Sequence, residues 1–273
     1  MAITISLDGS VALVTGAGAG IGQQIALWLA RAGAAVAVND IMADGAQATV
    51  DAIAAAGGRA VPLVANVRDA AQASLLAPRV VDAFGRLDVA VNNVGMTAGR
   101  VARSFVETPV DDAMAIVAQN LQSTYQCCLS EAQALLAQNE GGTIINVSSG
   151  ETTRPAVGLA SYGAAKAAIN HLTMTLAAEL GPHGIRVNAI APGTTFTKDI
   201  RAAMGQEQFA AISASTPLQR ECDPDELARL TVFLASDLAR CITGQLLLAD
   251  AGAHLGRKPL AVPGVASTTP GPA

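Results

Sequence analysis

The chain has 273 residues, of which 51% are hydrophobic, 14% charged and 3% aromatic, and its net charge is −5. This length is enough for one domain with a large core, and the acidic balance gives no reason to expect a nucleic-acid partner or an anionic membrane surface. So few charged residues indicate extensive buried surface, as in a homo-oligomer.

Short apolar stretches alternate with helical stretches along the chain. We expect strands at residues 11–15, 35–39, 60–64, 88–92, 143–147, 185–190 and 245–249. This alternation predicts an α/β fold of the single-domain Rossmann type, with a doubly wound, seven-stranded parallel sheet and helices on both faces. The domain is expected to span residues 1–255, and the Pro- and Gly-rich residues 256–273 to form a flexible tail.

The first predicted strand leads into a glycine-rich turn, Thr15-Gly-Ala-Gly-Ala-Gly-Ile-Gly22, and then into an apolar-periodic helix. Strand, glycine turn and helix together place backbone N–H groups and a helix N-terminus against a phosphate. Glycines suit this turn because a Cβ would block the approach of a pyrophosphate. A simple tight turn is the alternative interpretation.

Asp40 ends the second predicted strand, about 20 residues beyond the glycines. An acid at this place accepts hydrogen bonds from the adenosine ribose of NAD and repels the additional phosphate of NADP. Its neighbours Asn39 and Ile41 carry no positive charge, and neither does the glycine turn, so we expect NAD(H) to be preferred over NADP(H). Asp40 also fits as an N-cap of the next helix, and the two roles are compatible.

Tyr162 and Lys166 lie four positions apart, so on a helix both side chains lie on one face. A nearby ammonium group favours the phenolate and is expected to lower the pKa of Tyr162, which makes the phenol a usable proton donor and acceptor. Ser149 precedes this pair and follows the predicted strand 143–147. The alternative interpretation is an exposed contact on a helix surface.

Five polar or turn-forming residues come directly after the ends of predicted strands: Gly16, Asp40, Asn92, Ser149 and Pro192. Ligands of parallel sheets bind at the carboxyl ends of the strands. We therefore expect these residues to converge on one rim of the sheet.

The glycine turn, Asn92-Asn93-Val94-Gly95, Ser149, Tyr162-x-x-x-Lys166 and Pro192-Gly193 stand in the order and spacing of the short-chain dehydrogenase/reductase family. The chain resembles this family over about residues 7–252. The resemblance implies an NAD-dependent oxidoreductase that interconverts a secondary alcohol and a ketone. It implies that Tyr162 is the general acid/base, that Ser149 hydrogen-bonds the substrate oxygen, that Lys166 holds the nicotinamide ribose, and that Asn120 kinks its helix and holds a proton-relay water.

The resemblance also implies which residues bind the cofactor. The pyrophosphate would lie against Gly16, Gly20, Ile21 and Gly22. The adenosine would lie against Asp40, Asn66, Val67, Asn92, Asn93 and Gly95, and the nicotinamide against Pro192, Gly193, Thr195, Thr197, Tyr162 and Lys166. Asn66 stands where the family usually has Asp, but its amide oxygen can still accept a hydrogen bond from the adenine amino group.

Three variable segments, 96–107, 150–159 and 194–216, are expected to line the substrate pocket, with an amphipathic lid helix over residues 198–213. Glu151 and Arg154 either read substrate polarity or are solvated loop charges. The few aromatic residues favour aliphatic or alicyclic substrate contacts. Two alternative functions stay open: a 3-oxoacyl-thioester reductase, which in this family normally uses NADPH, and a non-catalytic NAD-binding sensor.

The four cysteines and three histidines lack metal-ligand spacing, so no metal is expected. The N-terminus has no basic segment followed by an apolar one, and no run of about 20 apolar residues lacks turn signals, so we expect a cytoplasmic protein without a membrane partner. The resemblance implies a homo-oligomer, a tetramer or dimer, formed through helices at about 111–137 and 158–180.

Overall fold

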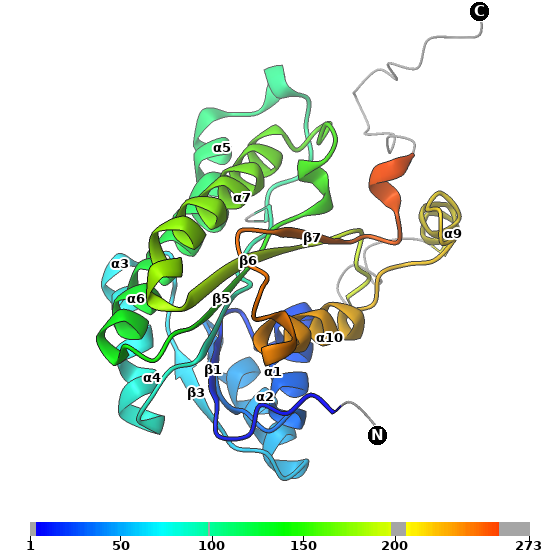
Figure 1. Cartoon of the computed structure of the whole chain (residues 1–273). Helices are drawn as coiled ribbons and strands as arrows, with labels where there is room; N and C mark the ends of the chain where they lie inside the picture. Colours follow the sequence, from blue (N-terminus) through cyan, green and yellow to red (C-terminus); the bar gives the residue numbers. More distant parts are fainter. Residues whose placement is uncertain (1–3, 98, 198–205, 257–273) are drawn as a thin grey trace, which may run out of the picture.

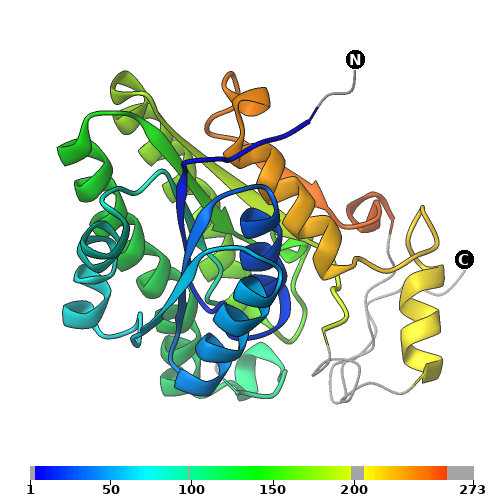
Figure 2. The same cartoon turned by 90° about the horizontal axis from the view of Figure 1, so that it is seen from below.

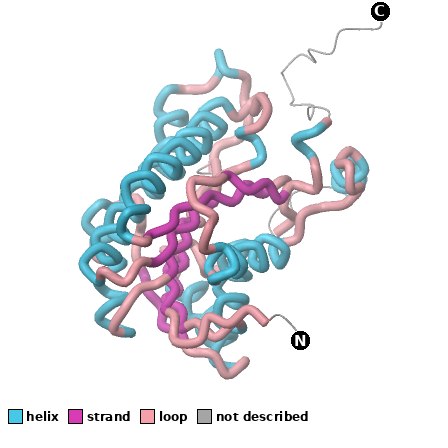
Figure 3. The backbone as a smooth tube through the Cα atoms, viewed as in Figure 1, coloured by secondary structure: helices cyan, strands magenta, loops and turns pink. Residues whose placement is uncertain are grey.

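The computed structural model describes residues 4–97, 99–197 and 206–256 of the chain. Seven strands form one parallel sheet in the order β3-β2-β1-β4-β5-β6-β7, which crosses the centre of the molecule (Figure 3). The strands are β1 Val11–Val14, β2 Ala35–Asp40, β3 Ala60–Val64, β4 Val89–Asn92, β5 Gly142–Val147, β6 Ile185–Pro192 and β7 Leu246–Ala249. The predicted single-domain, doubly wound α/β fold is confirmed.

The strands form because their apolar, β-branched residues are buried on both faces of the sheet. All four residues of β1 are buried, and they alternate between two cores. Ala12 and Val14 pack into the core on one face, whereas Val11 and Leu13 pack into the core on the other face. A parallel sheet of this kind must therefore be covered by helices on both sides.

Nine α-helices accompany the sheet in the part of the chain that the structure describes. They are α1 Gly20–Arg31, α2 Ala43–Ala55, α3 Ala70–Ser74, α4 Leu76–Phe84, α5 Val110–Val117, α6 Ser123–Gln138, α7 Ala160–Leu180, α9 Gln206–Ala214 and α10 Pro224–Ala235. Helices α1, α2 and α10 contribute to one core, and helices α4, α6 and α7 to the other. Helices α1 and α10 lie side by side (Figures 1 and 2).

The long helix expected at 111–137 is interrupted. A π-helical turn, Ala118–Gln122, separates α5 from α6, and such turns widen a helix locally and are frequent at functional sites. The second long helix, expected at 158–180, is α7.

The strand order reverses direction at β1, which lies between β2 and β4. A crevice forms at such a switch point, outside the carboxyl ends of the strands. Residues 198–205 of the expected lid and residues 257–273 of the expected tail lie outside the described residues; α9 covers the remainder of the lid segment. Within the described ranges, no helix combines the length and the apolar character needed to cross a bilayer.

Candidate active site

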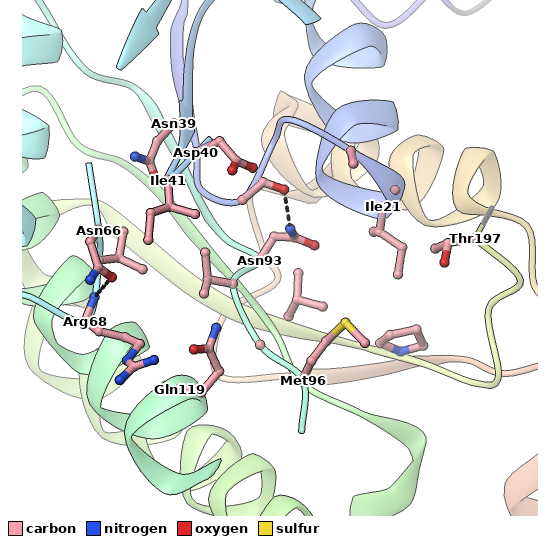
Figure 4. A pocket seen from close by; sticks show the side chains of 18 of the residues that line it. Ile21, Asn39, Asp40, Ile41, Asn66, Arg68, Asn93, Met96, Gln119 and Thr197 are labelled. Carbon is pink, nitrogen blue, oxygen red and sulfur yellow. Dashed lines mark hydrogen bonds between the residues drawn. The ribbon is translucent and has the colours of Figure 1, made fainter. Parts of the chain in front are cut away.

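A cleft of about 410 Å³ runs along the carboxyl ends of β1 to β6 (Figure 4). Most of its lining residues end a strand or come directly after one. They are Gly16, Ala19, Gly20, Ile21, Asn39, Asp40, Ile41, Ala65, Asn66, Val67, Arg68, Asn93, Val94, Gly95, Met96, Gln119, Val147, Ser148, Tyr162, Lys166, Pro192 and Thr197. The topology thus brings residues from six strand ends to one site.

The glycine turn forms one wall of this cleft. Gly16 and Gly20 have φ angles of 61° and 59°, in the left-handed region that glycine adopts without strain. Ala19 is the N-cap of α1 and provides no side-chain cap. No side chain of the N-cap therefore accepts a hydrogen bond from the N–H groups of the first helical turn, which lies beside the cleft. This combination suits an anionic group.

Gly22 differs from the other glycines of the motif, because it does not line the cleft. A Cβ at Gly22 would lie 2.3 Å from the carbonyl oxygen of Gly16 and 2.5 Å from Asn93 Nδ2. Its absence of a side chain lets α1 approach β1 and β4 closely. Gly22 therefore has a packing role in this structure, and its contact with a pyrophosphate stays a prediction.

Asp40 lies beside the glycine turn, and each of its carboxylate oxygens accepts one backbone hydrogen bond. Oδ2 accepts from the N–H of Gly18 and Oδ1 from the N–H of Met42, each at 2.9 Å. The second contact holds the backbone ahead of α2, but the N-cap of α2 is Met42 and has no side-chain cap, so the N-cap role weighed for Asp40 is wrong. The sequence shows no cation beside Asp40, but the fold brings Arg68 into the same cleft.

Two consecutive asparagines stand at the end of β4, Asn92 within the strand and Asn93 directly after it, and only one faces the cleft. Asn93 lines it and donates from Nδ2 to the carbonyls of Thr15 and Gly16, both at 3.1 Å. Asn92 points into the core, where its Nδ2 donates to Glu131 at 2.9 Å and to Asn146 at 3.0 Å. The expectation that Asn92 shapes the adenosine site is wrong, since successive side chains of a strand point to opposite faces.

Asn66 and Val67, after β3, both line the cleft. The amide oxygen of Asn66 accepts from the backbone N–H of Arg68 at 3.1 Å, which fixes the loop that carries Arg68. A carbonyl-type oxygen has two lone pairs, so Asn66 keeps capacity for one further hydrogen bond.

Lys166 and Asn120 meet at Gly95. A Cβ at Gly95 would lie 2.6 Å from Lys166 Nζ and 2.8 Å from Asn120 Oδ1, so only glycine leaves room for both side chains. Lys166 is 2% exposed and donates from Nζ to the carbonyl of Val147 at 2.7 Å. Burial lowers the pKa of Lys166 to about 7.

Asn120 lies in the π-helical turn and holds the backbone of Met96 by two hydrogen bonds. Its Nδ2 donates to the carbonyl of Met96 at 2.7 Å, and its Oδ1 accepts from the N–H of Met96 at 3.1 Å. Met96 has a φ angle of 144°, which is strained for a residue with a side chain. The Asn120 amide therefore stabilises a strained residue on the cleft wall.

Tyr162 lies in the first turn of α7 and lines the cleft. Burial raises the pKa of Tyr162 above its ordinary value; a hydrogen bond with Ser149 lowers it, and the negative charge of Glu151 raises it. The Lys166 Nζ lies 5.9 Å from the centre of the Tyr162 ring. The pKa of Tyr162 is therefore raised in this structure, where the sequence led us to expect a lowered one, because burial is the largest cause.

Some residues at and after the end of β6 line the cleft, and others hold the backbone behind it. Pro192 and Thr197 line the cleft. Gly193 donates its N–H to the carbonyl of Ala249 at 3.1 Å, and Thr195 is 5% exposed and pairs with Cys222 in an isolated β-bridge. Gly193 and Thr195 thus hold the turn in place behind the cleft instead of lining it.

Glu151 and Arg154 form an ion pair with each other beside the Ser149 turn, and both side chains are half-buried. The backbone N–H of Glu151 donates to Ser149 Oγ at 3.2 Å. The two residues are therefore more than solvated loop charges, because they are paired with each other and Glu151 contacts the turn that holds Ser149.

Sequence reasoning missed three polar residues of the cleft: Arg68, Gln119 and Ser148. Ser148 has the sequence context of a plain turn residue, but its hydroxyl donates to the Lys166 carbonyl at 3.3 Å and contacts Asn170. Arg68 and Gln119 each adjoin a motif residue, Val67 and Asn120, and that adjacency was the available signal. No cluster of three or more His, Cys, Asp or Glu side chains able to bind a metal occurs among the described residues.

The chain is similar to several proteins of known class. A family model described as enoyl-(acyl carrier protein) reductase matches residues 16–254. The chain is 37% identical over 254 residues to a short chain dehydrogenase/reductase of Aspergillus oryzae, with 92% of this chain and 97% of that protein aligned. It is 37% identical over 251 residues to an L-rhamnose 1-dehydrogenase (NAD(P)(+)) of Sphingomonas sp., covering 91% and 98% of the two chains.

A 7alpha-hydroxysteroid dehydrogenase of Escherichia coli is 35% identical over 249 residues, with 91% of this chain and 95% of that protein aligned. Among solved structures, a 7alpha-hydroxysteroid dehydrogenase complexed with NADH and 7-oxo glycochenodeoxycholic acid superposes with a TM-score of 0.86 at 34% identity. That superposition covers 91% of this chain and 96% of the other.

Proposed function

The chain belongs to the short-chain dehydrogenase/reductase family, and on this premise we propose that it interconverts a secondary alcohol and a ketone with NAD(H) as the preferred cofactor. One observation carries the proposal. A single cleft joins a glycine turn at an uncapped helix N-terminus to the side chains of Tyr162 and Lys166. The first part suits a dinucleotide, and the second suits proton transfer to or from an oxygen.

The residues of the cleft fit a nicotinamide dinucleotide. Gly16 and Gly20 expose backbone along one wall, Asp40 offers carboxylate oxygens at one end, and Lys166 lies near the other. We assign the pyrophosphate to Gly16, Gly20 and Ile21, and the adenosine to Asp40, Asn66, Val67, Asn93 and Gly95. When bound, the nicotinamide supplies or accepts the hydride.

Tyr162 is the proposed proton donor and acceptor. Its raised pKa keeps the phenol protonated at neutral pH, so it can hydrogen-bond a substrate carbonyl and give up its proton as that oxygen gains charge. Ser149 would hold the same oxygen through its hydroxyl. Lys166 would hold the nicotinamide ribose, and Asn120 would fix Met96 and the helix turn beside Lys166.

The preference for NAD(H) rests on Asp40, whose carboxylate would bond ribose hydroxyls and repel a phosphate on that ribose. Arg68 lies in the same cleft, so the preference is a balance of two charges. The L-rhamnose 1-dehydrogenase relative carries NAD(P)(+) in its name, so both cofactors occur among the relatives.

We further propose an aliphatic or alicyclic substrate. Tyr162 provides the one aromatic side chain among the described residues that line the cleft. Two relatives are named for a sugar and a steroid as substrates, neither of which requires aromatic stacking. A sugar, a hydroxysteroid and a small cyclic ketone are therefore the first compounds to test.

A homo-oligomer in the cytoplasm completes the proposal. Large apolar side chains of Tyr125, Leu129 and Leu136 on α6 and of Met174 on α7 are exposed in the single chain. Surfaces of this kind commonly become buried between subunits. Light scattering of the purified protein measures the oligomeric state directly.

The deciding experiment is NADH formation by the purified protein with pooled secondary alcohols, with NADP in parallel. Turnover with NAD is the expected result, and division of the active pool identifies the substrate. Turnover with NADP alone would remove the assigned role of Asp40. An additional pool of 3-hydroxyacyl thioesters tests the acyl-thioester activity, and binding of NADH without any turnover would favour the sensor.

A further inference from the structure

Arg68 lines the cofactor cleft at the end that holds Asp40, Ile41 and Asn66 (Figure 4). Its backbone is held on both sides. The N–H donates to Asn66 Oδ1 at 3.1 Å, and the carbonyl accepts from Gln126 Nε2 at 3.5 Å. A fixed backbone places the long side chain reproducibly along the cleft wall.

The guanidinium of Arg68 forms neither a hydrogen bond nor an ion pair with any residue in 4–97, 99–197 and 206–256. The nearest acid in sequence, Asp69, is occupied: its carboxylate accepts from the N–H groups of Ala71 and Gln72 and caps α3. The result is an uncompensated cation on the wall of a cleft.

Other arginines of the chain find partners. Arg86, Arg154 and Arg220 pair with carboxylates. Arg59 lies 5.2 Å from the centre of the Phe84 ring, and Arg31 lies 5.4 Å from that of Trp28. Arg68 is the arginine that lines the cleft, and its guanidinium has neither an ion pair nor a ring contact within the described residues.

The cleft near Arg68 lacks an aromatic side chain. Tyr162, the aromatic residue of the cleft, lies at the Lys166 end. Around Arg68 the walls are formed by the aliphatic side chains of Ile41 and Val67 and by the planar amide of Gln119. A flat base bound here would find its largest flat partner in the guanidinium of Arg68.

We propose that Arg68 stacks its guanidinium plane on the adenine ring of the dinucleotide and so closes the adenosine end of the cleft. This inference rests on the proposed function, because it needs a dinucleotide in the cleft. A guanidinium is planar, always charged and weakly hydrated, so it stacks on an aromatic face more favourably than an ammonium does. Arg68 is thus a positioning residue for the cofactor, remote from the reacting atoms.

Equilibrium binding tests this role without turnover. NADH, ADP-ribose and reduced nicotinamide mononucleotide are titrated against the wild-type protein, Arg68→Ala and Arg68→Lys. Loss of the stack is expected to raise the Kd for NADH and ADP-ribose by about 3- to 10-fold in Arg68→Ala. The Kd for the mononucleotide, which has no adenine, is expected to stay unchanged.

Arg68→Lys distinguishes the contribution of the flat guanidinium group from that of the positive charge. Lysine keeps the positive charge but has no flat face, so this variant is expected to bind NADH as weakly as Arg68→Ala. Arg79→Ala is the matched control, since Arg79 is an exposed arginine that bonds the Val64 carbonyl and does not line the cleft. Thermal melting of each variant verifies that its fold is retained, as expected for exposed positions.

Three results would overturn the inference. NADH binding restored by lysine would show that charge alone matters. A Kd for NADPH that rises much more than the Kd for NADH in Arg68→Ala would show that Arg68 reads a phosphate on the ribose. Unchanged binding in Arg68→Ala would show no contact. Wild-type protein that binds NADH but oxidises no alcohol would refute the proposed function and leave the Arg68 test intact.

Discussion

Two fully buried ionisable side chains lie on different sides of the active site, and only one of them faces the cleft. Lys166 lines the cleft beside Tyr162. Glu131 on α6 is 0% exposed and lies behind β4, where Asn92 donates to its Oε2. Burial brings both pKa values to about 7, downward for Lys166 and upward for Glu131.

A shifted pKa alone does not locate a catalytic group. Glu131 sits in a network of side-chain amides and Cys128 that ties α6 to β4 and β5. Glu131 is fully buried and does not line the cleft, whereas Lys166 borders about 410 Å³ of open space. Access decides between a structural and a chemical role.

The largest expected effect belongs to Tyr162, the neighbour of the accessible cation. Tyr162→Phe removes the proton donor and keeps the ring, so kcat is expected to fall about 10²- to 10⁴-fold. NADH binding, measured by fluorescence titration, is expected to change little. Turnover near the wild-type value would refute the proton role of Tyr162.

Lys166→Met and Glu131→Gln test the comparison directly. Lys166→Met removes the ammonium from the cleft, and kcat/KM is expected to fall by about 100-fold or more. Glu131→Gln keeps the shape of a side chain remote from the cleft, so kcat/KM is expected to stay within about 3-fold of wild type. Equal losses in the two variants would mean that the buried network reaches the active site.

Asp40→Ala tests a half-exposed carboxylate in the same cleft. Removal of the carboxylate is expected to narrow the ratio of kcat/KM with NAD to that with NADP by about tenfold, since two like charges a few Å apart repel by on the order of 1–4 kcal/mol. The measurement is the ratio of initial rates over both cofactors at several concentrations. A ratio equal to that of the wild-type protein would mean that Asp40 does not read the ribose.

The features of the fold that depend on local pattern could be predicted from the sequence. All seven strands lie within about two residues of their expected positions, because a buried parallel strand appears in the sequence as a continuous apolar stretch. The glycine turn and Asp40 reach the cleft for the same reason: both lie at strand ends. A residue whose position depends only on where a strand ends was therefore predictable.

The sequence pattern could not predict in which direction a side chain points or how deeply it is buried. Asn92 and Asn93 are adjacent, yet one enters the core and the other the cleft, which only the strand register decides. The pKa of Tyr162 depends on how deeply the phenol is buried. Arg68 lies in the same cleft as Asp40 because β2 and β3 pair in parallel and end at the same edge of the sheet.

The pH dependence of stability distinguishes the two buried groups by sign. Between its ordinary value of 4.5 and about 7, Glu131 keeps its proton only in the folded state, so stability falls as pH rises through this range. Between about 7 and 10.5, Lys166 is protonated only in the unfolded state, so stability rises with pH. Each contribution is on the order of 3–5 kcal/mol over its full pH range.

Urea unfolding at a series of pH values measures these slopes. In Glu131→Gln, the free energy of unfolding is expected to lose its slope against pH in the acidic range and to keep it in the alkaline range. In Lys166→Met, the slope is expected to disappear in the alkaline range and to remain in the acidic range. A slope that persists in the variant that lacks its group would assign it to another residue.

The smallest effect concerns Glu151, whose charge acts on Tyr162 from the turn that also holds Ser149. Because the carboxylate raises the pKa of Tyr162, Glu151→Gln is expected to move the Tyr162 limb of the pH profile of kcat/KM to lower pH. Glu140→Gln, which removes a carboxylate from the remote Arg86 pair, is the control and is expected to leave the profile in place. A limb that stays fixed in Glu151→Gln would mean that Arg154 neutralises the carboxylate completely, and the ion pair would then have a purely structural role, as Glu131 has.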